Sequence, residues 1–310
     1  MRVSFVGLLL LCVLYLCYGS SGWIWPWHWG DKAAILISLR APRLVAALTS
    51  GAILGAVGAA FQMVFRNPLA EPYVLGVSSG AALGGGLAMA GGFFEAGWRM
   101  GGLGCAVLGG LLALQIVLWM ARGRVPVSQL LLGGVILGAV LSSLNTVVLL
   151  LAGEDTNRVL RWLLGSLSAS FWEKNVVLVL VAVVGLPLLW RQSRQLNALS
   201  LGEETAASLG VDTWRVTSGS LRLGTMLASV VVGVVGVVGF VGLVAPHVLR
   251  RSVGADLRFV LPWSAMVGAS MMVVADLVAQ KLIYVDTLPV GAVTALIGAP
   301  ALLWVLRRDR

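Results

Sequence analysis

The chain has 310 residues, of which 59% are hydrophobic and only 11% are charged, and its formal net charge is +9. Soluble domains carry about 25% charged residues, so this composition excludes an ordinary soluble protein. The basic residues are scattered over loops, which argues against a partner nucleic acid and predicts loops that face the cytoplasm. The apolar runs are continuous, which excludes the alternating strands of a β-barrel and predicts one all-α, polytopic membrane domain over residues 1–310.

The first apolar run, residues 3–18, follows Arg2 and permits two interpretations. A cleavable signal peptide would fit the small residues at 20–22, whereas a retained membrane span fits the span count given below, and we favour the span. Four tryptophans come directly after this run and predict an interfacial belt, namely Trp23, Trp25, Trp27 and Trp29.

Eight further apolar blocks follow, at residues 43–64, 73–92, 100–121, 128–152, 174–190, 222–249, 259–280 and 287–306. The block 222–249 is too long and too rich in glycine for one simple span. Its glycines recur every three residues, so they weaken several faces of a helix rather than one. We expect a full helix that breaks near Gly239 to Gly242, followed by a short helix that passes through Pro246 and ends at Arg250.

The distribution of charge decides how often this block crosses the membrane. If the N-terminus is inside and the block crosses twice, 14 of the 22 basic residues face the cytoplasm. If it crosses once, the later loops change sides and only 9 of the 22 do so. Because cytoplasmic loops carry an excess of lysine and arginine, we predict about ten spans with both termini cytoplasmic.

A turn joins the second and third apolar blocks and holds Arg66, Asn67 and two prolines within seven residues. Pro68 and Pro72 remove two backbone donors and push the residues before them out of helical geometry. The chain must therefore turn here, at a membrane face. An ordinary loop between helices and a functional loop are both consistent with this chemistry.

A series of short motifs surrounds that turn, namely Arg40-Ala41-Pro42-Arg43, Gly51, Gly58, Gln62, Asn67-Pro68-Leu69-Ala70-Glu71-Pro72 and Leu75-Gly76-Val77-Ser78-Ser79-Gly80-Ala81. Together they resemble the permease subunits of bacterial ABC importers for iron-siderophore complexes, haem and cobalamin, the FecCD-type family. The resemblance covers essentially the whole chain. It implies the type II importer fold with ten transmembrane helices, and a homodimer in the inner membrane. It further implies two ATP-binding subunits and a periplasmic substrate-binding protein as partners.

The energy source has to be sought outside this chain. No G-x-x-x-x-G-K-[ST] motif occurs, which excludes ATP binding by a P-loop, so ATP and Mg²⁺ belong to the ATPase that the resemblance implies. Asp276 is the only acid deep within an apolar run, whereas a carrier driven by an ion gradient needs buried ionisable groups along its path. Such a secondary transporter is the alternative. A membrane-embedded enzyme would need convergent catalytic groups, and two histidines without a Cys/His cluster do not supply them.

The polar stretch 191–221 is the longest in the chain, and the span count places it in the cytoplasm. Residues 201–211 predict a short amphipathic helix with Ala206 and Leu209 on one face. A helix lying on the membrane surface is one interpretation. The string also resembles the family's coupling loop, L-G-x-x-x-A-x-x-L-G, which docks on the ATPase. The resemblance assigns that contact to Leu201, Gly202, Glu203, Ala206, Leu209 and Gly210.

Arg40 and Arg43 precede the second span on the predicted outer face. Arginines at the end of a span often only anchor it. In the family this arginine pair meets carboxylates of the periplasmic binding protein, and Lys281 is a looser match for a third cation because Gln280 competes for that position. Docking through such pairs would weaken with salt.

Of the predicted sites, the substrate path has the weakest support in the sequence. The resemblance implies a path at the homodimer interface, lined by the fifth span and by the turn that begins at Gln62 and runs through Asn67, Pro68, Leu69, Ala70, Glu71 and Pro72. The fifth span holds four small polar residues, Ser142, Ser143, Asn145 and Thr146. They either line a wet path or bond backbone within the bundle. The family's substrates are large chelates, and we favour an iron-siderophore complex, with haem and cobalamin as alternatives.

Overall fold

The computed structural model describes residues 2–19, 22–30, 32–73, 75–91, 99–121, 127–168, 172–280 and 288–308. The helices are α1 Arg2–Cys17, α2 Ala33–Ile35, α3 Ala41–Val64, α4 Val77–Ala90, α5 Arg99–Ala121, α6 Val127–Leu151, α7 Thr156–Leu163, α8 Trp172–Arg191, α9 Ser193–Ser200, α10 Glu203–Ser208, α11 Thr213–Val235, α12 Val241–Val253, α13 Leu257–Ala279 and α14 Val290–Arg308. Strands β1 (Tyr18–Gly19) and β2 (Gly22–Trp23) form a small antiparallel hairpin, and a π-helical turn, Leu36–Arg40, leads into α3. The predicted all-α class is confirmed.

Among the described residues, six helices are long and apolar enough to cross a membrane, and four shorter apolar helices accompany them. The long ones are Ala33–Val64, Met100–Met120, Gln129–Leu151, Trp172–Arg191, Thr213–Val235 and Leu257–Ala279. The shorter ones are Phe5–Cys17, Val77–Ala90, Val241–Arg250 and Val290–Pro300. These apolar helices equal the predicted spans in number.

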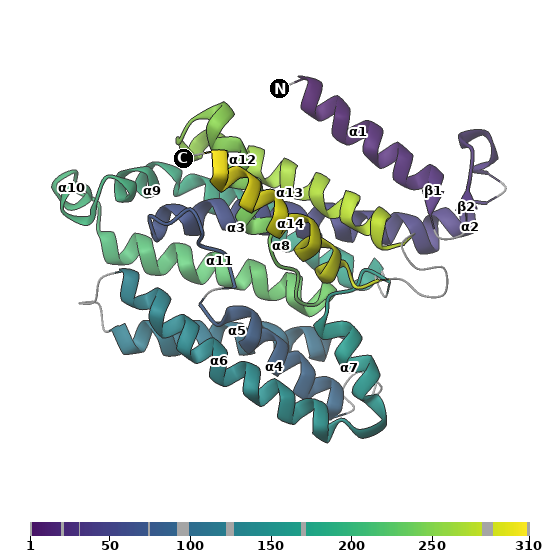
Figure 1. Ribbon diagram of the computed structural model, residues 1–310, viewed down its shortest axis with the longest axis horizontal. Coiled ribbons are helices and arrows are strands. Elements are labelled where there is room, and N and C mark those ends of the chain that lie inside the picture. The colour runs from purple at the N-terminus through teal and green to yellow at the C-terminus, as the bar shows by residue number, and fades with distance from the viewer. Residues whose placement is uncertain are drawn as a thin grey trace.

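The helices form two groups with α11 between them (Figure 1). In one group α3 packs against α8, α12 and α13, and in the other α4 packs against α5 and α6. Helix α11 contacts α3 and α8 on one side and α4 and α5 on the other. Helix α3 forms the centre of the core, because every residue from Ile53 to Val64 is buried. The short helix α10 projects from one end of the molecule, and the β1–β2 hairpin lies at the opposite end (Figure 1).

Glycines bring α3 and α13 into backbone contact. A Cβ added at Gly51 would collide with the carbonyl of Gly268, and one added at Gly55 would collide with the carbonyl of Ser264. Close approach of this kind lets van der Waals contact and weak hydrogen bonds replace the hydrophobic effect, which does not drive helix association in lipid. Helices α3 and α13 are therefore one tightly packed unit.

The double block 222–249 does break, but earlier than predicted. Helix α11 ends at Val235 and α12 begins at Val241, so the break spans 236–240 rather than Gly239 to Gly242. Gly236 has φ +82°, and a Cβ there would collide with the carbonyl of Trp162. Tertiary contact at Gly236 thus ends the helix. Helix α12 also runs on past Arg250 to Val253.

The polar stretch 191–221 is mostly helical. It contains α9, α10 and the first turns of α11, which begins at Thr213. The Asp212 side chain accepts a hydrogen bond of 3.0 Å from the backbone N–H of Arg215 and so caps α11. The non-helical part of this segment is therefore short.

Candidate functional site

The turn between α3 and α4 is folded back into the bundle. Gln62, buried at the end of α3, donates from Nε2 to the backbone carbonyl of Leu243 at 3.2 Å. Asn67 closes the turn itself, because its Oδ1 accepts from the N–H of Leu69 at 2.9 Å. Asn67-Pro68-Leu69 lies toward the surface, whereas Ala70 is buried. The predicted path residues of the turn are therefore brought together, with one part exposed and one part in the core.

Glu71 links this turn to the broken helix. Its Oε1 accepts from the backbone N–H of Phe240 at 2.5 Å, directly before α12 begins. Phe240 has φ +68° and caps α12 without any side-chain bond of its own. A carboxylate is favoured at a helix N-terminus, where backbone N–H groups lack partners and the helix dipole is positive. Pro72 completes the contact, since it lies where a side chain on Gly242 would be.

Each of the four polar residues of α6 makes a hydrogen bond within the chain, and their lining of a path stays a prediction. Asn145 points into the bundle, where its Nδ2 donates to the carbonyls of Ser79 at 3.1 Å and Leu141 at 3.0 Å. The Ser142 hydroxyl lies 3.1 Å from the hydroxyl of Ser79 on α4. Ser143 and Thr146 bond backbone carbonyls of their own helix and are exposed.

Helix α6 is the least buried of the six long helices. Its exposed apolar side chains are Leu132, Val135, Ile136, Val140, Leu144, Val147, Leu150 and Leu151. Ser142, Ser143 and Thr146 are exposed on the same helix, so it presents a mixed apolar and polar surface. The described part of one chain leaves that surface uncovered.

The predicted coupling segment forms a short helix between two glycines with positive φ, Gly202 at +117° and Gly210 at +80°. Ala206 is completely buried against the bundle, whereas Leu209 is 62% exposed. Ala206 and Leu209 were expected on one face of the helix, but α10 ends at Ser208 and only Ala206 of the two packs against the bundle. Leu201, Leu209 and both glutamates at the start of α10 are on the surface.

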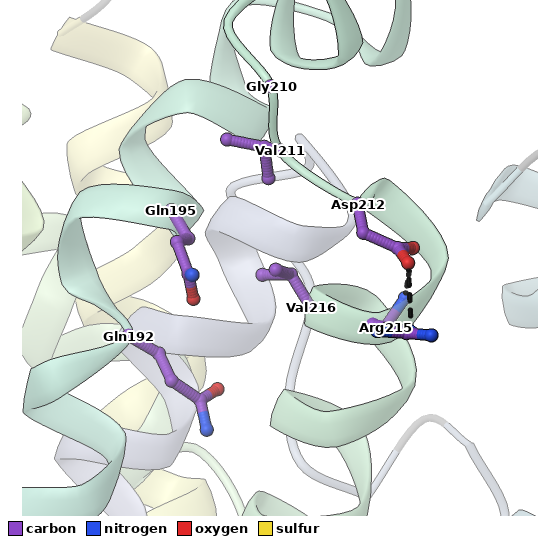
Figure 2. Close-up of a pocket in the computed structure, with 7 residues that line it drawn as sticks. All are labelled: Gln192, Gln195, Gly210, Val211, Asp212, Arg215 and Val216. Atoms are coloured by element: carbon purple, nitrogen blue, oxygen red, sulfur yellow. Dashed lines mark hydrogen bonds and ion pairs between the residues drawn. The ribbon is translucent and has the colours of Figure 1, made fainter.

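A cavity of about 400 Å³ lies beside this segment, between α9 and the start of α11 (Figure 2). It is lined by Gln192, Gln195, Gly210, Val211, Asp212, Arg215 and Val216. Figure 2 shows that the Asp212 carboxylate and Arg215 guanidinium meet at its rim, and they form an ion pair at 3.0 Å. The surface beside α10 is thus hollowed, with an ion pair at the rim of the hollow.

Arg40 and Arg43 both have partners inside the protein. Arg40 is buried and donates to the carbonyls of Leu16 at 2.6 Å and Gly22 at 2.8 Å, which ties α1 and the hairpin to α3. Arg43 makes a two-bond ion pair with Asp276, from Nη2 to Oδ1 at 2.7 Å and from Nε to Oδ2 at 2.8 Å. Docking of a binding protein on these arginines stays a prediction, and Lys281 lies outside the described residues.

Sequence reasoning singled out Asp276 but missed its partners. The Tyr15 hydroxyl donates to Asp276 Oδ2 at 2.5 Å, and Gln280 Nε2 donates to the same oxygen at 2.8 Å. Opposite charges near the same end of two apolar runs were the available signal for the Arg43–Asp276 pair, because membrane-embedded charges usually pair. The Glu71 bond to Phe240 had no such signal, because its donor is a backbone N–H and not a charged side chain.

Comparison with known proteins gives one consistent result. The sequence matches the FecCD transport family over residues 7–308. It is 38% identical over 312 residues to the vitamin B12 import system permease protein BtuC of Escherichia coli O9:H4 (strain HS), covering 98% of this chain and 94% of that protein.

Two solved structures have the same fold. One, a transporter assigned to the metal-chelate type of ABC transporters and seen in an inward-facing conformation, has a TM-score of 0.90 and 32% identity, covering 99% of both chains. The other, PsaBC from Streptococcus pneumoniae in complex with Fab, has a TM-score of 0.55 and 18% identity, covering 85% of this chain and 89% of that one. The turn, the broken helix and the exposed short helix therefore occur in a chain with a full-length family match, and the chain belongs to the FecCD transport family.

Proposed function

We propose that this chain is the permease subunit of an importer that two separate ATPase subunits drive, and that it carries a large metal chelate across the inner membrane. One observation carries the proposal. A chain of membrane-spanning helices presents a short, exposed helix, α10, at one end, and its sequence contains no P-loop. An exposed helix of this kind supplies a surface on which an ATPase can dock.

The turn that follows α3 and the start of α12 form the gate in this proposal. Glu71 joins the two, so a movement of α3 reaches the helix break at 236–240 directly. Alternating access requires such an element with two arrangements whose populations ATP binding shifts. The polar, exposed side chains of α6 would line the path at the interface with a second copy of the chain.

Cobalamin is the first substrate to test. The curated relatives at 38% identity are named as vitamin B12 import permeases, and the solved relative at 32% identity is assigned to the metal-chelate type. An iron-siderophore complex and haem are the other two candidates. A periplasmic binding protein would deliver the chelate, and both termini would lie in the cytoplasm.

Reconstitution tests the proposal. The chain is purified with the ATPase subunits and the binding protein from its own genome and placed in proteoliposomes. Uptake of radiolabelled cyanocobalamin, ferrichrome and haem is then measured with ATP and with a non-hydrolysable analogue. We expect ATP-dependent uptake of one chelate and a stimulation of ATP hydrolysis by the loaded binding protein. Uptake by the chain alone in an ion gradient would overturn the proposal.

A further inference from the structure

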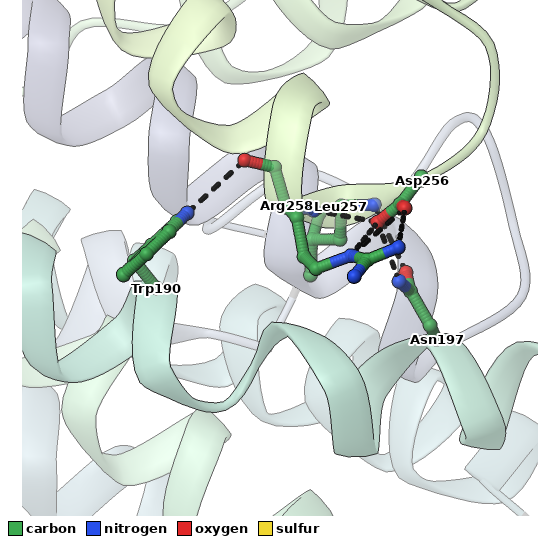
Figure 3. A network of polar contacts seen from close by, with 5 residues as sticks. All are labelled: Trp190, Asn197, Asp256, Leu257 and Arg258. Atoms are coloured by element: carbon green, nitrogen blue, oxygen red, sulfur yellow. Dashed lines mark hydrogen bonds and ion pairs between the residues drawn. The ribbon is translucent and has the colours of Figure 1, made fainter.

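A polar junction joins α9 to the beginning of α13 (Figure 3). The Asn197 side chain uses both ends of its amide. Its Nδ2 donates to Asp256 Oδ1 at 2.7 Å, and its Oδ1 accepts from the backbone N–H of Leu257 at 2.9 Å. An amide that makes both bonds fixes the position and the rotation of one helix relative to the other, because each bond has its own direction.

Asp256 is itself held rigidly. Its Oδ2 accepts from Arg258 Nη2 at 2.6 Å and from Nε at 2.9 Å, and its Oδ1 accepts from the Arg258 backbone N–H at 2.9 Å. The bond from the Arg258 backbone N–H makes Asp256 the N-cap of α13. On the other side, Trp190 of α8 donates from Nε1 to the Arg258 carbonyl at 3.0 Å. Figure 3 shows these side chains converging on the first turn of α13.

The same helix α9 carries the exposed helix α10. Only Leu201 and Gly202 separate the two, and Gly202 is fixed because its N–H donates to the carbonyl of Leu199 at 3.1 Å. Leu196 and Leu199 of α9 are buried, as is Ala206 of α10. A displacement of α10 must therefore move α9, because the link between them is short and bonded.

Helix α13 continues the connection into the core. Its backbone contacts with α3 at Gly51 and Gly55 leave no room for sliding, since a single added Cβ collides there. Helix α3 in turn leads into the turn that holds Glu71. The α9–α13 junction is thus a polar contact that connects the projecting end of the molecule to its most tightly packed pair of helices.

We propose that Asn197 is a positioning residue that makes α9 and α10 move as one body with α13 and α3. In this proposal Asn197 acts through its hydrogen bonds to Asp256 and Leu257 and not through contact with substrate or ATPase. The proposal rests on the proposed function in one respect only, namely that the movement to be transmitted begins at an ATPase bound to α10. The rigidity of the junction can be measured without any partner.

The first experiment measures that rigidity in the solubilised chain. Spin labels are placed at Glu204→Cys on α10 and Val274→Cys on α13, both exposed, after Cys12, Cys17 and Cys105 are replaced by serine. Pulsed electron paramagnetic resonance then gives the distance distribution between the labels. We expect one narrow distribution in the parent chain and a broad or shifted one in Asn197→Ala. The matched control is Arg194→Ala, an exposed side chain on the same helix, which should leave the distribution narrow.

The alanine variant could broaden the distribution simply by misfolding, so a second pair of variants exchanges the amide and the carboxylate of the junction. Asn197→Asp places two carboxylates where a 2.7 Å hydrogen bond stood and should broaden the distribution. Adding Asp256→Asn restores a donor and an acceptor at the junction and should narrow it again. An unchanged, narrow distribution in both Asn197→Ala and Asn197→Asp overturns the proposal.

The second experiment uses the reconstituted importer with cyanocobalamin, ferrichrome and haem as probes. In Asn197→Ala we expect the number of chelate molecules imported per ATP hydrolysed to fall about fivefold or more, the size of a typical coupling between sites, while the ATPase still copurifies. An unchanged ratio would overturn the positioning role even if the distances broaden. If the parent importer moves none of the three chelates, the proposed function fails, and the distance measurement still decides the junction.

Discussion

Arg43 and Asp276 form an ion pair that is closed off from solvent, with side-chain exposures of 13% and 0%. Tyr15 and Gln280 donate two further hydrogen bonds to Oδ2 of the carboxylate. Burying two charges costs free energy that their attraction recovers only when the geometry is good and the other lone pairs are bonded. Both conditions hold here, so the pair fixes the ends of α1, α3 and α13 relative to one another.

Removing one partner should therefore cost more than removing both. In Asp276→Ala the guanidinium of Arg43 stays buried without a counter-ion, and we expect a loss of about 3–5 kcal/mol in the free energy of unfolding. The double variant Arg43→Met/Asp276→Leu should recover most of that loss. The measurement is the midpoint of thermal unfolding in detergent, followed by intrinsic tryptophan fluorescence. Equal midpoints for the single and the double variant would show that the pair does not behave as a buried one.

The junction at Asp256 should resist acid. Hydrogen bonds from Arg258 and Asn197 hold the pKa of the Asp256 carboxyl well below its usual range of about 4. A depressed pKa in the folded state means that the stabilisation is present above the unfolded pKa and is lost only as the pH falls through the folded one. We expect the distance between labels on α10 and α13 to be the same at pH 7 and pH 5. A distribution that broadens between these values contradicts the assignment of Arg258 and Asn197 as the groups that face Asp256.

At the scale of elements, the glycine contact between α3 and α13 organises the core. We expect Gly268→Ala to destabilise the protein by about 1–3 kcal/mol, because the new methyl group would collide with the backbone at Gly51. Gly219→Ala in α11 is the matched control, since nothing lies within 4 Å of the added Cβ. There the higher helix propensity of alanine should leave stability unchanged or raise it by up to about 1 kcal/mol. Thermal unfolding of both variants in one detergent separates the two effects, and equal shifts would refute close packing at Gly268.

The apolar runs predicted the long helices well because hydropathy over some 20 residues is a strong local signal. The ends of the helices and the break within the block 222–249 were harder to predict. The break falls at Gly236 because of its contact with Trp162, which is distant in the sequence, and the other glycines of the block gave an equal local signal. The start of α11 was within reach, since Asp212 before Thr213 is a good N-cap, but its polar first turns masked it.

At the scale of the whole molecule, the proposed dimer would place the exposed surface of α6 against a second copy of the chain. In a two-fold dimer the same patch contacts itself, so cysteines on it crosslink to their own copies. In a chain without native cysteines, we expect at least one of Ser142→Cys, Ser143→Cys and Thr146→Cys to give a dimer with a short bismaleimide in membranes. Leu180→Cys on α8, which is also exposed, should stay monomeric. Crosslinking at α8 and not at α6 would place the dimer interface elsewhere.

The candidate site could be predicted only in part from the sequence. The turn from Gln62 to Pro72 and the short helix α10 stand out locally, through prolines, glycines and polarity. The hydrogen bonds that connect these elements to the rest of the bundle could not be predicted locally. They join residues far apart in the chain, Glu71 with Phe240 and Asn197 with Asp256. Arg40 lies in a motif that stands out in the sequence, but the sequence did not predict where its side chain binds. The guanidinium donates to backbone carbonyls of α1 and of the hairpin.

The Arg43–Asp276 pair also sets a condition on biosynthesis. The two residues are 233 positions apart, so at about 5–20 residues per second a ribosome needs roughly 10 to 50 s to make the counter-ion after the cation. During that time α1 and α3 have entered the bilayer while Arg43 has no carboxylate to meet. A nascent chain that stops before α13 keeps an uncompensated charge in the membrane. The ion pair can therefore form only after synthesis has passed the C-terminal end of α13, which holds Asp276.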